Sequence, residues 1–328
     1  MSEETVLEVI YYLYLLLVIV GTLANILAFI VFSRKKFKNT VFSTYFRILL
    51  IIDLIGLLYS TLGKFLNFEF GINLRNISAF LCRITMPIVY SIPPISAYIT
   101  VMISFDRWLT IAKPAFFLLR KNKIFQVLIC IAIIVINFIY NGQLFFSHFM
   151  GDPADNTSTP SCRIIDYTTL ATMDLINSTL LPFFLMLLFT LLTVKALFDA
   201  SKIIRQTSIN PVRRNSNASS KKDNLRKRDI KFAIVSILLN IIFLVLNGPF
   251  TIYSFLYDYI LTDSYYSWMA IVIMLFLTYC NHAIVFFINI FVNKQFRDEL
   301  YIILTRKKVP KEKNSTNLDA VNEGYEED

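Results

Sequence analysis

The sequence predicts an all-α integral membrane protein, a bundle of seven transmembrane helices with a short amphipathic eighth helix. Its 328 residues are 56% hydrophobic and only 17% charged, far from the composition of a soluble domain of this size. The apolar residues gather in seven runs with few or no charges, each close to or longer than the ~20 residues with which a helix crosses a bilayer. Helices are expected because such runs are too long and too apolar for barrel strands. The runs cover approximately residues 9–32, 43–62, 84–105, 124–150, 175–194, 232–257 and 264–292.

The distribution of Lys and Arg predicts how these helices are oriented. Of the 32 Lys and Arg residues, only Lys64, Arg75, Arg83 and Arg163 fall on one side of the seven runs. The side that carries the rest is cytoplasmic by the positive-inside rule. We therefore expect a plasma-membrane protein with its amino terminus outside and its carboxyl terminus inside. The net charge of +9 reflects this topology and does not predict nucleic-acid binding, because the basic loops hold almost no aromatic residues for base stacking.

Flanking parts complete the predicted organisation. Residues 1–8 form an extracellular amino terminus, and residues 9–304 form the transmembrane domain. Its longest cytoplasmic loop, about 199–228, is rich in Ser, Asn, Lys and Arg and is expected to be disordered or partly helical. Apolar residues spaced along 294–304 predict an amphipathic helix at the membrane surface. The polar tail 305–328 is expected to be disordered.

Polar residues inside the first two runs need partners. Asn25 in the first run is expected to bond across a helix interface. Asp53 is the only acid deep within any run, and an ionised carboxylate there costs about 2.5 to 3.5 kcal/mol on insertion scales. Its candidate partners are Ser96 in the third run and Asn281 and His282 in the seventh. A bound cation and a protonated, hydrogen-bonded carboxyl group are both open as solutions.

The third run ends in Asp106-Arg107-Trp108, where the helix leaves the hydrocarbon. A charged boundary anchor is the simple interpretation of this acid-base pair. Cys82 opens the same helix, and Lys113-Pro114 follows it. The fixed spacing of this cysteine, the acid-base pair and the Lys-Pro pair favours a functional role for Asp106 and Arg107 over a simple boundary anchor.

The outer loops hold a candidate disulfide and a candidate glycosylation site. Cys82 and Cys162 both fall in an oxidising compartment, where they are able to tie the third helix to the loop after the fourth. Two free cysteines are the alternative. Asn156 begins an Asn-Thr-Ser sequon and is the residue expected to carry a glycan.

Two prolines interrupt the later runs. Pro182 lies in the fifth run and Pro249 in the sixth, where each removes a backbone donor and permits a kink. Kinked helices are natural moving parts, although membrane helices also tolerate a single proline without a special role.

Taken together, these residues resemble the rhodopsin-like (class A) family of G protein-coupled receptors over nearly the whole chain. No motif is decisive singly, but their order and spacing are specific. The resemblance rests on Asn25, Asp53, Cys82, Asp106-Arg107-Trp108, Pro114, Cys162, Pro182, Phe243 with Pro249, and Asn281.

The resemblance implies a ligand-activated receptor that signals to a heterotrimeric G protein. Arg107 is then expected to stay paired at rest, with Asp229 at the cytoplasmic start of the sixth helix as its candidate partner. An outward swing of that helix would free Arg107. An exposed pair is worth about 0 to 1 kcal/mol, which suits a switch. Phe243 and Pro249 mark the expected kink of the sixth helix, as Pro182 does in the fifth.

The sequence departs from the family pattern at positions that take part in receptor activation. Asn247 stands just before the sixth-helix proline, where the family usually has a Trp, and Thr190 replaces the Tyr of the fifth helix. The Asn-Pro-x-x-Tyr motif of the seventh helix is replaced by Val285-Phe286-Phe287-Ile288-Asn289. The family's sodium pocket is formed only in part, by Asp53, Ser96 and Asn281.

The predicted ligand pocket carries no signature of an amine or of retinal. Val89 stands where amine receptors carry an Asp, and Tyr279 stands where opsins carry the Schiff-base Lys. The outer mouth is acidic and aromatic, with Asp166, Asp258 and Asp263 as candidate contacts. A basic or amidated neuropeptide is therefore the favoured ligand, as for a neuropeptide receptor of invertebrate type. A lipid or small chemosensory ligand is the alternative within the same fold.

Other classes of protein are disfavoured. The sequence has no internal repeat or path of intramembrane charges that predicts a transporter or channel. Its two histidines, His148 and His282, have no carboxylate or Cys at metal-ligand spacing, and it has no Gly-rich phosphate loop. No enzyme activity, metal or cofactor is expected. The expected partners are an extracellular ligand, a heterotrimeric G protein and membrane lipid.

Overall fold

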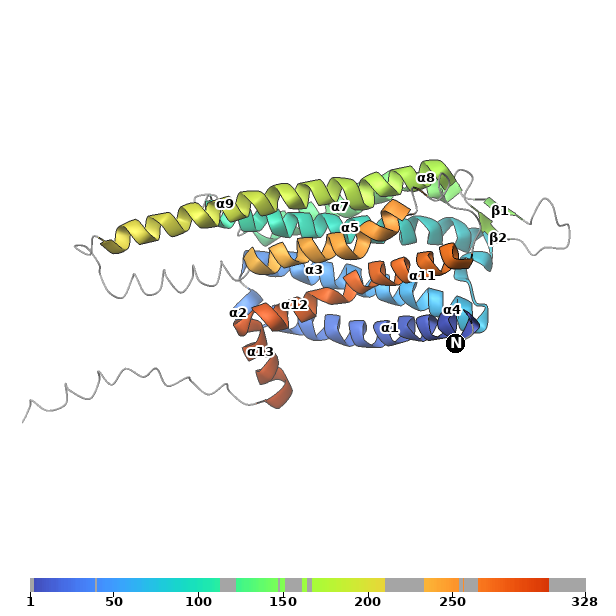
Figure 1. The fold of residues 1–328 in the computed structure, drawn as a ribbon, viewed down its shortest axis with the longest axis horizontal. Coiled ribbons are helices and arrows are strands. Elements are labelled where there is room, and N and C mark those ends of the chain that lie inside the picture. Colours follow the sequence, from blue (N-terminus) through green and yellow to red (C-terminus); the bar gives the residue numbers. More distant parts are fainter. Residues whose placement is uncertain are drawn as a thin grey trace, which may run out of the picture.

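The computed structural model describes residues 3–38, 40–112, 122–146, 148–150, 161–163, 167–209, 233–253, 256 and 265–306. Within these residues seven helices are long and apolar enough to cross a membrane, and they form one elongated bundle (Figure 1). The predicted seven-helix fold is confirmed. The spans are Thr5–Ser33, Phe42–Phe70, Ala79–Ala112, Lys123–Tyr140, Thr169–Asp199, Ala233–Tyr253 and Met269–Val292.

Some spans are single helices, and others join α-helices through a short π-helical or 3-10 stretch. The single helices are α1 (Glu3–Ser33), α5 (Ala79–Ala112), α7 (Lys123–Tyr140) and the sixth span. The second span comprises α3 (Val41–Gly56), η1 (Leu57–Thr61) and α4 (Leu62–Phe70). The fifth comprises α8 (Tyr167–Asp174), η5 (Leu175–Leu180) and α9 (Leu181–Ile209), and the seventh α11 (Tyr265–Cys280), η6 (Asn281–Ala283) and α12 (Ile284–Val292). The shorter elements are α2 (Lys35–Lys38), η2 (Leu74–Asn76), η4 (Gly142–Phe146), β1 (His148–Met150), β2 (Ser161–Arg163) and α13 (Lys294–Thr305).

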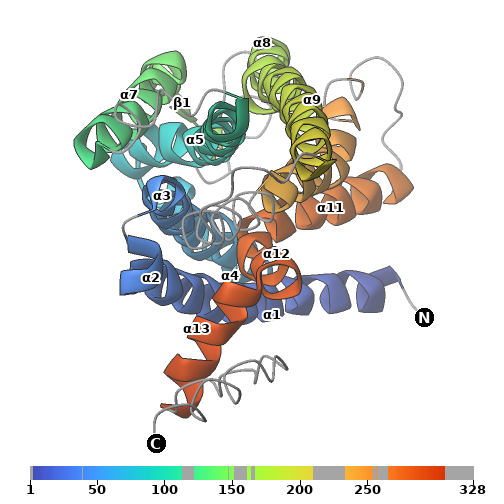
Figure 2. The same cartoon turned by 90° about the vertical axis from the view of Figure 1, so that its left-hand side faces the viewer.

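The third span, α5, is the central helix of the bundle. It contacts α3, α7 and α9, as Figure 2 shows. Of its most apolar stretch 61% is buried, against 17% for α7. The helix is continuous although Pro87, Pro93 and Pro94 lie within it. Its side chains therefore pack mainly against protein, whereas the exposed apolar residues of α1, α7 and α9 are suited to contact lipid.

A cluster of phenylalanines joins α1, α3 and α13 at one end of the bundle, which we call the α13 end. Phe32 of α1 stacks on Phe46 of α3 with ring centroids 4.9 Å apart, and its ring lies 5.4 Å from that of Phe296. Asn293 caps α13, because its side-chain oxygen accepts hydrogen bonds from the backbone N–H groups of Gln295 and Phe296. The predicted eighth helix is thus confirmed as α13, which leaves the bundle at an angle (Figure 1).

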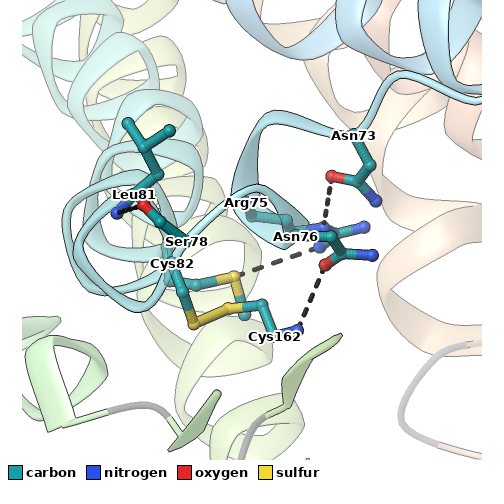
Figure 3. The surroundings of a disulfide bond; sticks show 8 residues. Asn73, Arg75, Asn76, Ser78, Leu81, Cys82 and Cys162 are labelled. Atoms are coloured by element: carbon teal, nitrogen blue, oxygen red, sulfur yellow. Dashed lines mark hydrogen bonds between the residues drawn. A yellow bond between two sulfur atoms is a disulfide. The ribbon is translucent and has the colours of Figure 1, made fainter. Parts of the chain in front are cut away.

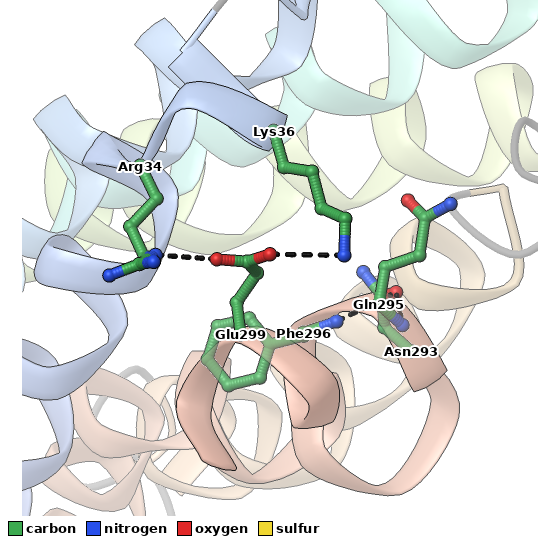
Figure 4. Close-up of polar contacts among 6 residues, drawn as sticks. All are labelled: Arg34, Lys36, Asn293, Gln295, Phe296 and Glu299. Carbon is green, nitrogen blue, oxygen red and sulfur yellow. Dashed lines mark hydrogen bonds and ion pairs between the residues drawn. The ribbon is translucent and has the colours of Figure 1, made fainter. Parts of the chain in front are cut away.

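Ion pairs also hold α13 against the turn after α1. Glu299 lies between Arg34 and Lys36, with Arg34 Nε 2.5 Å and Lys36 Nζ 3.0 Å from its carboxylate oxygens (Figure 4). The Glu299 side chain is only 7% exposed. Burial raises the pKa of Glu299, but the hydrogen bonds and charges of Lys36 and Arg34 outweigh burial and hold its pKa below the usual range.

Replacing Glu299 by glutamine is expected to lower the free energy of unfolding near pH 7 by about 1 kcal/mol, because both pairs are lost and both cations are partly exposed. A carboxyl group whose pKa is lowered by folding stabilises the protein fully above its unfolded-state pKa, and that contribution is lost as the pH falls through the folded-state pKa. The difference in Tm between wild type and Glu299→Gln should therefore shrink between about pH 5 and pH 3. Thermal unfolding of the purified protein measures it. Asp298→Asn is the control, since Asp298 has no ion pair within the described residues, and a pH-independent Glu299→Gln difference would refute the pairing.

The fourth span ends earlier than the sequence predicts. The uncharged run continues to residue 150, but α7 ends at Tyr140 and is followed by η4 and β1. Asn141 donates through Nδ2 to the backbone carbonyl of Tyr90 over 3.3 Å and to the hydroxyl of Ser91 over 3.1 Å, both on α5. β1 then pairs with β2 in an antiparallel ladder. The prediction of a span to residue 150 was wrong because a strand, and not a helix, satisfies the backbone groups of 148–150.

Candidate functional site

A large cavity opens at the other end of the bundle, which we call the disulfide end. Its empty volume, with the solvent-filled mouth included, is about 1450 Å³. The walls are mainly apolar and come from η2 and from the second, third, fifth, sixth and seventh spans. Val89 of α5 and Tyr279 of α11, two residues that the sequence assigns to the pocket, both line it.

The predicted disulfide joins Cys82, near the start of α5, to Cys162 of β2. Figure 3 shows this bond beside the loop that contains η2. The backbone N–H of Cys162 donates to the side-chain oxygen of Asn76 over 3.1 Å. Because Leu74 and Arg75 of the same loop line the cavity, the disulfide and this hydrogen bond fix part of the cavity rim.

The floor of the cavity adjoins a buried polar cluster around Asp53. His282, which lines the cavity, places Nδ1 2.8 Å from Oδ1 of Asp53, and the Ser96 hydroxyl donates to the same oxygen over 2.7 Å. Nδ2 of Asn25 donates to the backbone carbonyl of His282 over 2.8 Å. Two of the three candidate partners thus contact Asp53. Asn281 instead lines a small adjacent cavity with Asp53 and Ser96, and a sodium site there stays a prediction.

In the sixth span, Asn247 lies in the cavity wall with Phe243. Its Nδ2 donates to the backbone carbonyl of Phe243 over 2.9 Å, and its own carbonyl accepts from the Thr251 hydroxyl over 3.0 Å. The hydroxyls of Thr251 and Thr179 lie 2.7 Å apart. This chain of contacts links the residues before Pro249 to the fifth span and to the cavity, at the position where the sequence lacks the Trp of the family.

Changes of helix type lie beside the cavity in the second span, at η1, and also in the fifth and seventh spans. The π-helical stretch η5 ends just before Pro182, and η6 tightens the seventh span to a 3-10 turn at Asn281–Ala283 without a proline. Such stretches often mark hinges. The seventh span therefore has an irregular turn although the Asn-Pro-x-x-Tyr motif is absent from the sequence.

At the α13 end, Asp106 and Arg107 form a buried pair with each other. The Arg107 guanidinium donates to the Asp106 carboxylate and lies over the ring of Phe42, 4.8 Å from its centroid. Arg107 is 2% exposed. Trp108 stacks instead on Phe189 of α9, with centroids 6.1 Å apart. Arg107 is thus held inside the bundle by a carboxylate and an aromatic face.

A second polar cluster lies one turn from Arg107, and the sequence did not point to it. The Ser104 hydroxyl lies 3.0 Å from that of Ser236 and donates to Oδ1 of Asn240 over 3.0 Å. Nδ2 of Asn240 donates to the Thr190 hydroxyl over 2.7 Å. The cluster ties α5, α9 and the sixth span together. Single Ser, Thr and Asn residues in apolar runs form no spaced motif, so only their packing reveals the cluster.

Two cationic residues that the sequence indicates only as markers of topology also line the cavity. Lys64 of α4 and Arg75 of η2 both line the cavity. Several predicted site residues lie outside the described residues, so their roles stay predictions: Asp166, Asp258 and Asp263 at the ligand mouth, Asn156 as glycan acceptor, and Asp229 as partner of Arg107.

Within the described residues, seven helices suited to cross a membrane surround a cavity that opens at one end, as expected for a multi-pass membrane protein. Residues 24–292 match the 7 transmembrane receptor (rhodopsin family), and the chain belongs to that family. The family is one of receptors and not of enzymes, and it implies an extracellular ligand and a G protein as partners.

The similar curated proteins include several N-arachidonyl glycine receptors. The chain is 25% identical to that of Macaca fascicularis over 289 residues, which cover 87% of this chain and 81% of the relative. The identity to the Homo sapiens receptor is also 25% over 289 residues, and to the Mus musculus receptor 26% over 290, with the same coverage. The similarity therefore extends over nearly all of the transmembrane domain.

Proposed function

We propose that this protein is a plasma-membrane receptor that is activated by a lipid-like amphiphile and signals to a heterotrimeric G protein. Its amino terminus lies outside and its carboxyl terminus in the cytoplasm. The chemistry of the cavity is the observation on which the proposed class of ligand rests. Its mainly apolar walls extend from Leu74 beside the disulfide down to His282 in the seventh span, and an apolar chain gains free energy by leaving water for such walls.

The names of the relatives support the same ligand class. Each of the similar receptors is called an N-arachidonyl glycine receptor, and an arachidonyl chain is a long hydrocarbon. At 25% identity the relatives support a class of ligand for this chain, and not that compound itself.

The neuropeptide ligand that the sequence favours has less support. It rests on acids at the outer mouth, of which Asp174 lines the described cavity, whereas Asp166, Asp258 and Asp263 lie outside the described residues. The described wall residues that carry a positive charge, Lys64 and Arg75, would repel a basic peptide. We therefore place the lipid-like ligand first.

The proposed mechanism begins at the floor of the cavity. A ligand that reaches His282 and Asn247 alters the contacts that tie the seventh span to Asp53 and the sixth span to Phe243. Outward movement of the sixth span then separates Asn240 from its partners on α5 and α9 and exposes Arg107 to the G protein. The ligand shifts this equilibrium only by the difference in its affinity for the two states.

The test records G protein dissociation in cells against a library of N-acyl amino acids and fatty acids and, in parallel, a library of amidated peptides. Val89→Trp fills the cavity wall and is expected to remove the response to lipids at an unchanged surface level. Ile139→Trp is the matched control, because Ile139 of α7 is 73% exposed on the outside of the bundle. A response to peptides alone, or a lipid response that survives Val89→Trp, would refute the proposal.

A further inference from the structure

Two cationic side chains line the wall of the cavity, near the disulfide end. Lys64 lies on α4, the last part of the second span, and its half-buried side chain lines the cavity. Arg75 lies on η2, just beyond that span, and lines the same cavity. Only residues 71–73 separate α4 from η2, so both cations lie in the same part of the cavity lining. They therefore form one positive region on this wall.

Neither cation is neutralised by an acid within the described part of the chain. Lys64 makes no hydrogen bond or ion pair there. Among the described residues, the Arg75 side chain donates to neutral groups, the side-chain oxygen of Asn73 at 3.3 Å (Figure 3) and the sulfur of Met86 at 4.0 Å. The described acid in the cavity wall is Asp174, whose carboxylate accepts a hydrogen bond from Ser178. Two like charges without a counter-ion attract an anion from solution.

We propose that Lys64 and Arg75 form an anion-binding subsite at the outer end of the cavity, which takes the carboxylate of an amphipathic ligand. This inference rests on the proposed function and specifies the ligand as an acid. The planar guanidinium of Arg75 suits a carboxylate through paired N–H···O bonds, and Lys64 adds a point charge. The apolar walls beyond them, which include Val89 and Phe250, take the hydrocarbon chain.

The subsite also predicts which ligands the cavity should reject. A cationic headgroup placed beside Lys64 and Arg75 would meet two like charges without compensation, which is unfavourable in a partly dry site. A neutral ester would leave both cations without a partner. Because the difference between acid and ester is confined to one charged group, matched ligands of this kind isolate the contribution of the subsite.

The test measures ligand binding to the purified, full-length receptor by thermal stabilisation, which does not depend on signalling. The probes are N-arachidonyl glycine and its methyl ester, which share one hydrocarbon chain. The variants are Lys64→Gln and Arg75→Gln, with Lys64→Arg as the charge-conserving variant. Arg83→Gln is the matched control, since Arg83 lies on the same end of the protein, is exposed and does not line the cavity.

For the wild type, the acid is expected to bind about 10- to 100-fold more tightly than the ester, the range for a hydrogen bond to a charged group. Lys64→Gln and Arg75→Gln should each remove most of that difference by weakening the acid alone. Lys64→Arg and Arg83→Gln should preserve it. Equal binding of acid and ester, or an acid affinity unchanged in both glutamine variants, would overturn the subsite and leave a lipid receptor standing. Failure of both probes to bind the wild type would overturn the lipid proposal and the subsite together.

Discussion

Replacing Arg107 by alanine is expected to impair G protein activation strongly while ligand binding persists. Arg107 lies at the α13 end of α5, paired with Asp106 and stacked over Phe42, far along the helix from Val89 in the cavity wall. Its guanidinium is the charged group that outward movement of the sixth span would uncover for a partner. We expect the response to fall at least about tenfold, equivalent to about 1.4 kcal/mol of lost coupling. Nucleotide exchange on the G protein with reconstituted receptor measures it.

The alanine variant leaves the buried Asp106 without its cation and is therefore at risk of misfolding. A more conservative substitution is needed beside it. Arg107→Gln keeps a hydrogen-bond donor beside Asp106 and should lose signalling to the same extent. Asp106→Asn provides the opposite control, since it weakens the hold on Arg107 and should raise ligand-independent exchange. An unchanged response in both Arg107 variants at equal surface level would remove Arg107 from the mechanism.

The membrane environment explains how much of the fold is predictable from the sequence. Lipid offers no partner to backbone groups, so an uncharged run of sufficient length has to be a helix, and seven such runs predict seven spans. The end of α7 was less predictable. Asn141 contacts the backbone of Tyr90 on a neighbouring helix, and contacts of this kind depend on packing that hydropathy does not describe.

Some residues of the candidate site are likewise predictable from the sequence, and others are not. Cys82, Asp53 and Arg107 stand out because each is a rare residue type in an apolar context. The cluster of Ser104 and Asn240 does not stand out, because its members are common polar residues whose spacing along the chain follows no motif. In the sequence Lys64 indicates only the orientation of the helices, and the structure is needed to show that its side chain lines the cavity.

Replacing His282, the partner of Asp53, is expected to have the second large effect, a loss of stability. His282→Ala should lower the free energy of unfolding by about 3 kcal/mol, the upper end of the cost of leaving a buried polar group without its hydrogen-bond partner. Both side chains are almost inaccessible, with exposed fractions of 3% for His282 and 1% for Asp53. After the substitution Asp53 keeps the Ser96 hydroxyl, and the imidazole ring leaves a void against Gly56, where a Cβ would lie 3.1 Å from Nε2 of His282.

A double-mutant cycle of Asp53→Asn and His282→Ala, followed by thermal unfolding in detergent, separates the pair from the void. We expect a coupling energy of about 2 kcal/mol, well above the ~0.6 kcal/mol average of polar contacts between membrane helices. Thr278→Val is the matched control one turn away, since Thr278 bonds backbone carbonyls of Leu246 and Met274 and should cost less than about 1 kcal/mol. A coupling energy near zero would mean that Asp53 is stabilised without His282. A large one would make this pair the link by which the cavity floor holds the second and seventh spans together, so that a ligand touching His282 acts on both spans at once.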